Sequence, residues 1–259
     1  MNLSTFRIFS VLRSEADAYG LRYSSTAAIA IIPFFLIAIF MILGTYQCTR
    51  PAVLWTLREN RPVELLTFII LVISSVRGFI VVRQMKTDGE SRYSITFIWI
   101  FSFLLFLIAM EEVAWGQWLF GFESPDFFQR FNKQGETTLH NIGFLQGHSE
   151  FFRFAFGVSG IIGMTFLASP KFRKLAVPLL VLPYILIITV LSGIDLYGDF
   201  FILPELVDRG TARLSEVVEL LIATSAFLYL SLKSRSLVPG SKLERSTTVP
   251  KPQPLNSSE

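Results

Sequence analysis

The chain has 259 residues, of which 52% are apolar, 14% aromatic and only 17% charged, with a net charge of +3. Long uncharged apolar stretches alternate with short charged segments, which is the pattern of a multi-pass membrane protein and excludes an ordinary soluble domain. A single cysteine excludes an internal disulfide, and two histidines leave little material for a typical zinc site. The basic residues lie beside the apolar stretches, which gives no case for a nucleic-acid partner.

The apolar stretches predict an all-α fold, an integral membrane bundle of about six transmembrane helices within residues 26–232. Residues 1–25 carry apolar side chains at helical spacing with arginines among them, which indicates either an amphipathic cytoplasmic segment or a frayed basic terminus. Residues 233–259 are rich in Ser, Pro and Lys, which predicts a disordered cytoplasmic tail. The predicted spans are 27–46, 64–82, 93–110, 151–168, 175–194 and 214–232.

Two features of the predicted bundle concern its packing and its surface. Gly157, Gly160 and Gly163 recur every three residues in the fourth span, and small residues at this spacing allow close helix approach. Residues 120–131 are rich in Phe and could form a helix lying in the membrane interface, with residues 124–126 as its start signal.

The distribution of charge predicts the orientation. With six spans both termini lie on one side, and Lys and Arg are more numerous on that side. The positive-inside rule therefore places both termini in the cytoplasm of a cell whose plasma (inner) membrane holds the chain. The outer side is net acidic, and it carries the long polar connection 111–150.

Acidic residues gather at the outer ends of four different spans, which suggests a shared polar pocket. Carboxylates at membrane depth are costly and usually face a bundle interior or a water-filled cavity. These acids are Glu64, Glu111, Glu112, Asp195, Asp199, Glu216 and Glu219.

A cation site is one interpretation of this group. Glu136 and His140 stand four residues apart, so that both could ligate one ion from a helical turn. Carboxylates with one imidazole suit a divalent metal such as calcium, magnesium or manganese, or a carboxylate-bridged iron pair. The candidate metal ligands are Glu112, Glu136, His140, Asp195, Asp199, Glu216 and Glu219.

General acid–base chemistry is a second interpretation, with Glu111, Glu112 and His140 as the candidate catalytic residues. Adjacent Glu111 and Glu112 cannot share a helix face, so one could face the pocket while the other pairs elsewhere. A carboxyl group at the hydrocarbon boundary could donate a proton near neutral pH. The polar donors Trp115, Gln117 and Asn141 would then bind a substrate or cofactor.

Two further interpretations stay open. The acids could form structural ion pairs with arginines of the neighbouring loops, and the tryptophans could be interface anchors. The acids could also line an ion path in a transporter. The candidate arginine partners are Arg58, Arg61, Arg209 and Arg213.

The motifs of the connection resemble those of a group of uncharacterised bacterial multi-pass membrane proteins. Residues 111–117 read EEVAWGQ, residues 121–125 read GFESP and residues 134–141 read QGETTLHN, while 58–64 read RENRPVE before the second span. The group's pattern is EE-x-x-WGQ, then a GFE-x-P-like turn, then QGE-x-x-LHN. The resemblance covers most of the membrane region and implies no activity. A looser similarity exists to intramembrane metal-dependent lipid hydrolases of the alkaline ceramidase type, whose several-histidine metal set this chain lacks.

Three classes of function follow from these interpretations. The chain could be a metal- or acid-assisted enzyme acting on a lipid or lipid-linked substrate. It could instead be a non-catalytic subunit of a larger membrane complex, in contact with other helices, lipids or pigments. The third class is an ion or solute transporter. The expected partners are membrane lipids and, in the second class, other membrane-protein subunits.

Overall fold

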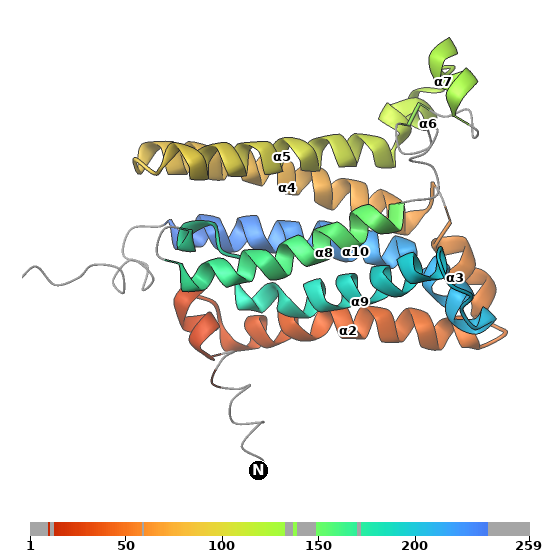
Figure 1. Ribbon diagram of the computed structural model, residues 1–259, viewed down its shortest axis with the longest axis horizontal. Helices are drawn as coiled ribbons and strands as arrows, with labels where there is room; N and C mark the ends of the chain where they lie inside the picture. The colour runs from red at the N-terminus through yellow and green to blue at the C-terminus, as the bar shows by residue number, and fades with distance from the viewer. Residues whose placement is uncertain are drawn as a thin grey trace, which may run out of the picture.

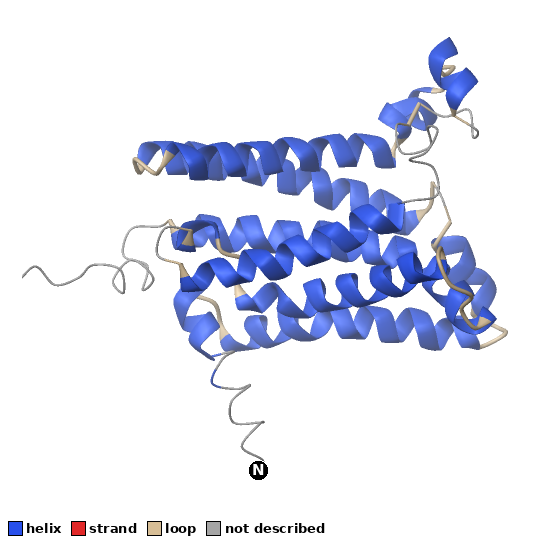
Figure 2. Ribbon diagram, viewed as in Figure 1, coloured by secondary structure: helices blue, strands red, loops and turns tan. Residues whose placement is uncertain are grey.

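The computed structural model of the chain describes residues 10, 13–58, 60–132, 137–138, 149–169 and 172–237. These residues form helices joined by loops, without a strand (Figure 2). Six of the helical segments are long and apolar enough to cross a membrane, which confirms the predicted all-α membrane bundle. The long helices are α2 (Tyr23–Thr45), α4 (Pro62–Thr87), α5 (Arg92–Glu112), α8 (Ser149–Thr165), α9 (Leu182–Gly198) and α10 (Glu205–Ser236). The short elements are α3 (Arg50–Thr56), α6 (Gln117–Phe120), α7 (Asp126–Phe131), η1 (Ala114–Gly116), η3 (Phe166–Ala168), η4 (Arg173–Leu175) and η5 (Leu179–Val181).

The bundle has two ends with different contents (Figure 1). The terminal end holds a short helical segment, residues 13–19, together with the α4–α5 turn and the end of α10. The far end holds α3, α6, α7 and the start of α10. All the acids singled out in the sequence that the structure describes lie toward the far end, so this end carries the candidate site.

Helix α10 is the centre of the bundle. It packs against α4, α9, α8 and α2, and both hydrophobic core clusters include its side chains, such as Leu230 and Leu221. It is the least apolar span, with a mean hydropathy of 1.5, and more than half of its span is buried. Helix α2 is the most apolar, at 2.8, and only 6% of its span is buried. The polar helix is inside and the most apolar helix outside, which is the arrangement expected in hydrocarbon rather than in water.

Small residues let neighbouring helices approach closely, as the sequence predicted. A Cβ atom added to Gly157 on α8 would lie 2.3 Å from the Thr189 hydroxyl of α9 and 3.0 Å from its backbone. A Cβ atom at Gly160 would meet Ile185 at 2.6 Å, and one at Gly163 would meet Val177 at 2.6 Å. Gly157 and Gly160 are therefore the surface on which α9 packs, and Gly163 contacts the connection that precedes α9.

Several predicted boundaries were wrong, each for a local reason. The sixth span begins at Glu205 rather than near residue 214, because Pro204 and two acids of the first turn start a helix there. The predicted loop 47–63 contains α3, which has a proline at its start. The helix predicted in the Phe-rich segment 120–131 does form at its start signal, as α7 from Asp126 to Phe131, whereas residue 120 ends α6 and Gly121 (φ 64°) follows it.

The terminal end is tied together by side chains of α10. Lys233 donates to the backbone carbonyl of Lys174, and the Tyr229 hydroxyl donates to the carbonyl of Leu175 at 3.1 Å. Lys174 in turn contacts Glu90 in the α4–α5 turn, with N–O distances of 2.7 and 2.8 Å. The last turns of α10 therefore hold the connection before α9 beside the turn that joins α4 to α5.

Candidate functional site

One arginine organises the acids of the far end. Arg153 lies in the second turn of α8, and its side chain is only 9% exposed. Its Nη1 donates to Glu219 of α10 at 3.0 Å, and its Nη2 donates to Asp195 of α9 at 3.1 Å. Glu150, one turn earlier on α8, lies 3.9 Å away. A single buried guanidinium thus joins three helices through charge-assisted hydrogen bonds.

Two further polar residues extend this network. Thr211 of α10, whose hydroxyl donates to the Asp208 backbone carbonyl at 3.1 Å, is a polar neighbour of the Asp195 carboxylate. Asp199, which follows the last turn of α9, is an electrostatic neighbour of both Glu150 and Asp195.

Glu112 brings a fourth helix to this group. It is partly buried at the last position of α5. Its carboxyl group interacts electrostatically with Glu219, Glu216 and Glu64, and with the opposite charge of Arg153. Carboxylates from α4, α5 and α10 therefore lie near one another, and those of α9 reach the same group through Arg153.

The two adjacent acids at the end of α5 have different surroundings, as predicted. Trp115 donates from its indole Nε1 to Glu111 at 2.7 Å, whereas Glu112 interacts with the acids of the bundle. The turn between them and α6 is strained: Ala114 (φ 45°), Trp115 (φ 55°) and Gly116 (φ 85°) are all left-handed. This turn directs the indole ring back over α5.

Gln117 organises the connection that follows. Its carbonyl oxygen accepts the backbone N–H of Thr137 at 2.8 Å and the Ser124 hydroxyl at 3.2 Å. Asn132 donates to the side chain and carbonyl of Thr138 at 3.0 and 3.2 Å. The oxygen of Gln117 thus holds two segments of its own loop together.

Three of the predicted site residues, Glu136, His140 and Asn141, lie outside the described residues. Among the residues that the structure does describe, no three His, Cys, Asp or Glu side chains form a group that could hold a metal ion. The metal site therefore stays a prediction, and so do the roles given to these three residues.

Two of the four predicted arginine partners of the acids have other neighbours, and the pairings of Arg58 and Arg213 stay predictions. Arg209 contacts Glu205 within the first turns of α10, and Arg61 lies over the ring of Trp55 at 4.9 Å. The buried partner is Arg153, a residue within the predicted fourth span (151–168) that the sequence did not single out. The signal that could have found it is Glu150 three residues before, a spacing that places both side chains on one helix face.

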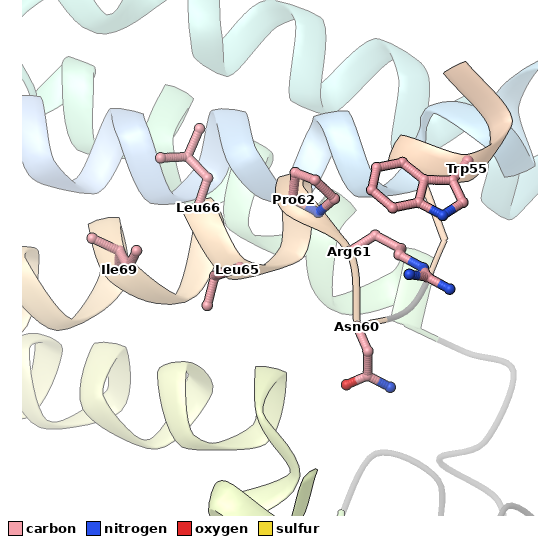
Figure 3. A pocket seen from close by; sticks show the side chains of 7 residues that line it. All are labelled: Trp55, Asn60, Arg61, Pro62, Leu65, Leu66 and Ile69. Atoms are coloured by element: carbon pink, nitrogen blue, oxygen red, sulfur yellow. The ribbon is translucent and has the colours of Figure 1, made fainter. Parts of the chain in front are cut away.

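A surface cleft of about 470 Å³ lies beside this group, between α3 and the first turns of α4 (Figure 3). Trp55, Asn60 and Arg61 line one end of it. Leu65, Leu66 and Ile69 line the other, and Pro62 lies between them. The cleft adjoins the network through α4, whose Glu64 interacts with Glu112.

The fold and these contacts define the chain as a multi-pass membrane protein with a buried, predominantly acidic network at one end of its bundle. No family model, curated protein or solved structure matches the chain.

Proposed function

We propose that this chain is an acid–base enzyme that acts on a lipid or lipid-linked substrate, with Glu112 as the proton-exchanging group. The observation that carries the proposal is the charge balance around Glu112. The carboxylates of Glu64, Glu216 and Glu219 and the guanidinium of Arg153 are electrostatic neighbours of Glu112. The two short contacts of that cation go to Glu219 and Asp195. A group of this composition takes up and releases protons, which is what general acid–base catalysis requires.

The location of the group favours a lipid substrate. Glu112 stands at the end of a span, where hydrocarbon meets the polar connection. Helix α5 packs on α4 and exposes large apolar side chains such as Phe103 and Ile108 along its length. A lipid head group reaches this depth without leaving the bilayer, whereas a soluble substrate has to enter from the aqueous side.

The orientation belongs to the same proposal. The excess of Lys and Arg on the side of the termini supports a cytoplasmic terminal end in a bacterial inner membrane. Glu112 then faces the outer leaflet. Labelling of the exposed Cys48, at the far end, with a membrane-impermeant maleimide in intact cells tests this orientation. Labelling only after the cells are opened would reverse it.

The test of the enzyme compares Glu112→Gln with Glu123→Gln, an exposed acid in the same connection. Purified protein is incubated with a total lipid extract of its host membrane, and the lipids are quantified by mass spectrometry. The wild-type chain and the Glu123 variant should convert a lipid that Glu112→Gln leaves unchanged. If all three proteins give the same lipid profile, Glu112 does not carry this chemistry.

A metal-assisted form of the same enzyme would use Glu136 and His140 together with the acids of the bundle. Elemental analysis of the purified chain decides between the two forms. Stoichiometric calcium, magnesium, manganese or iron that is lost in His140→Ala supports the metal, and a metal-free active protein excludes it.

A non-catalytic subunit is the second candidate, favoured by exposed apolar side chains at the far end. Phe120 is 80% exposed, Phe200 75% and Ile202 fully exposed. These side chains could contact other membrane proteins. In that case chemical cross-linking in membranes should join the chain to a partner, and Glu112→Gln should lower the yield of the complex without changing any lipid.

Ion or solute transport stays a further candidate. The buried hydroxyls of Ser74, Ser75 and Ser102 donate to backbone carbonyls, whereas the buried Ser192 hydroxyl of α9 has no hydrogen-bond partner among the described residues. The membership of the bacterial group with the EE-x-x-WGQ pattern likewise stays a proposal, carried by its motif residues alone.

A further inference from the structure

The cleft beside α3 joins a polar end to an apolar end along one side of α4 (Figure 3). Arg61, Leu65 and Ile69 recur every four residues, so their side chains follow one ridge of the helix. From Arg61 to Ile69 this ridge is about 12 Å long, at about 1.5 Å per residue. That length approaches the thickness of the hydrocarbon in one leaflet, about 15 Å.

We propose that this cleft binds a membrane phospholipid, with its phosphate on Arg61 and one acyl chain along Leu65 and Ile69. The site is distinct from the Arg153 network, and it stands whether or not Glu112 carries out acid–base chemistry. The occupant follows from the charge at one end of the cleft and from the apolar wall at the other.

Arg61 supplies the charge for an anion. The Arg61 guanidinium lies over the Trp55 ring, with its carbon 4.9 Å from the ring centroid. The ring contacts the flat face of the guanidinium, so the N–H donors at the edge of the guanidinium can still bind an anion. Within the described part of the chain, Arg61 makes no salt bridge to a carboxylate. The Glu64 carboxylate accepts the backbone N–H of Asn60, which precedes α4. The cation that lines the cleft is Arg61.

The apolar wall selects a lipid over a soluble phosphate compound. Leu65, Leu66 and Ile69 are 40%, 45% and 43% exposed, and they lie within the membrane span of α4. Trp55 is 46% exposed beside the charge, at the depth where tryptophan meets the head-group region. A phospholipid has a phosphate head group at the membrane interface and acyl chains below it, which matches the charged end and the apolar end of the cleft.

The test measures lipid binding to the full chain in detergent by native mass spectrometry, after the protein has been freed of lipid. Three probes are titrated: phosphatidylglycerol, diacylglycerol with the same acyl chains, and inorganic phosphate. One phosphatidylglycerol should bind most tightly. Arg61→Gln should weaken it about tenfold, the effect of losing one charge-assisted hydrogen bond, whereas the exposed Arg213→Gln should leave it unchanged.

A second pair of variants tests the acyl-chain wall. Ile69→Trp fills the cleft and should weaken phosphatidylglycerol binding. Ile73 lies one turn further along the same ridge, is about as exposed as Ile69 and does not line the cleft. The Ile73→Trp variant should therefore bind phosphatidylglycerol as the wild type does.

Three results would overturn the proposal. Diacylglycerol could bind as tightly as phosphatidylglycerol, inorganic phosphate could compete for the site at the same concentration, or Arg61→Gln and Arg213→Gln could behave alike. Glu112→Gln separates this proposal from the enzymatic one, because it should abolish lipid conversion while phosphatidylglycerol binding persists.

Discussion

Replacing Arg153 by alanine should destabilise the bundle more than any other single change at the far end. The substitution removes donors at 3.0 and 3.1 Å and leaves Glu219 and Asp195 together without their cation. Breaking a buried ion pair from one side costs about 3–5 kcal/mol. The carboxylates are 26% and 21% exposed, so water recovers part of this and we expect about 3 kcal/mol. For a chain of this size that corresponds to a melting temperature lower by roughly 6–12 °C.

The assay is thermal unfolding of the purified chain in detergent, followed by circular dichroism. The control is Arg213→Ala, an exposed arginine at the same end, which should shift the midpoint by about 1 °C or less. A triple variant with Arg153→Met, Asp195→Asn and Glu219→Gln should recover much of the lost stability, because the two carboxylates that Arg153 contacts most closely are then also neutral. If Arg153→Ala and Arg213→Ala unfold at the same midpoint temperature, the Arg153 guanidinium does not hold the three helices together.

Three further predictions concern other parts of the chain. Gly157→Ala should lower the unfolding free energy by about 1–3 kcal/mol, because its Cβ would press on the α9 backbone at 3.0 Å. Gly210→Ala, which meets nothing within 4 Å, should raise it by up to about 1 kcal/mol, and equal thermal shifts for the two would contradict the packing. Gln117→Ala should expose the connection to trypsin several-fold faster than the exposed control Gln47→Ala, because two hydrogen bonds to its oxygen are lost; unchanged digestion would show that these bonds do not order the loop. Burial raises the pKa of Glu15 above its ordinary 4.5, so docking of residues 13–19 should weaken as pH rises through and above that value. Hydrogen exchange of this segment should lose that pH dependence in Glu15→Gln, and an unaltered pH profile would refute the assignment.

The membrane bundle could be predicted from the sequence because hydrocarbon imposes a length and a composition on every span. The apolar stretches near residues 27–46 and 93–110 correspond to α2 and α5 within a few residues. The start of α10 could not be placed by hydropathy, because its first turns carry Glu205 and Asp208 outside the apolar stretch. Helix caps, not hydrophobicity, decide that boundary.

The acids of the candidate site could be predicted from their position at the ends of spans, but their partner could not. Which side chains meet depends on the rotation of each helix about its axis, and the sequence does not specify that rotation. Arg153 reaches Asp195 and Glu219 because Gly157 lets α8 lie close to α9 one turn further on. The predicted pairings of Arg209 and Arg61 with the acids of the network failed for the same reason.

The central position of α10 has a consequence for how the protein is made. This helix is the last of the six described spans along the chain, yet both core clusters need its side chains. The α4–α5 and α8–α9 hairpins can enter the bilayer earlier as separate pairs, but each then leaves a face without its neighbour. The last span is also the one least able to enter lipid by hydrophobicity alone. When α10 inserts between these two hairpins, its side chains would complete both core clusters in a single late step. A chain that stops before residue 205 would therefore be a substrate for membrane quality control rather than a partly working protein.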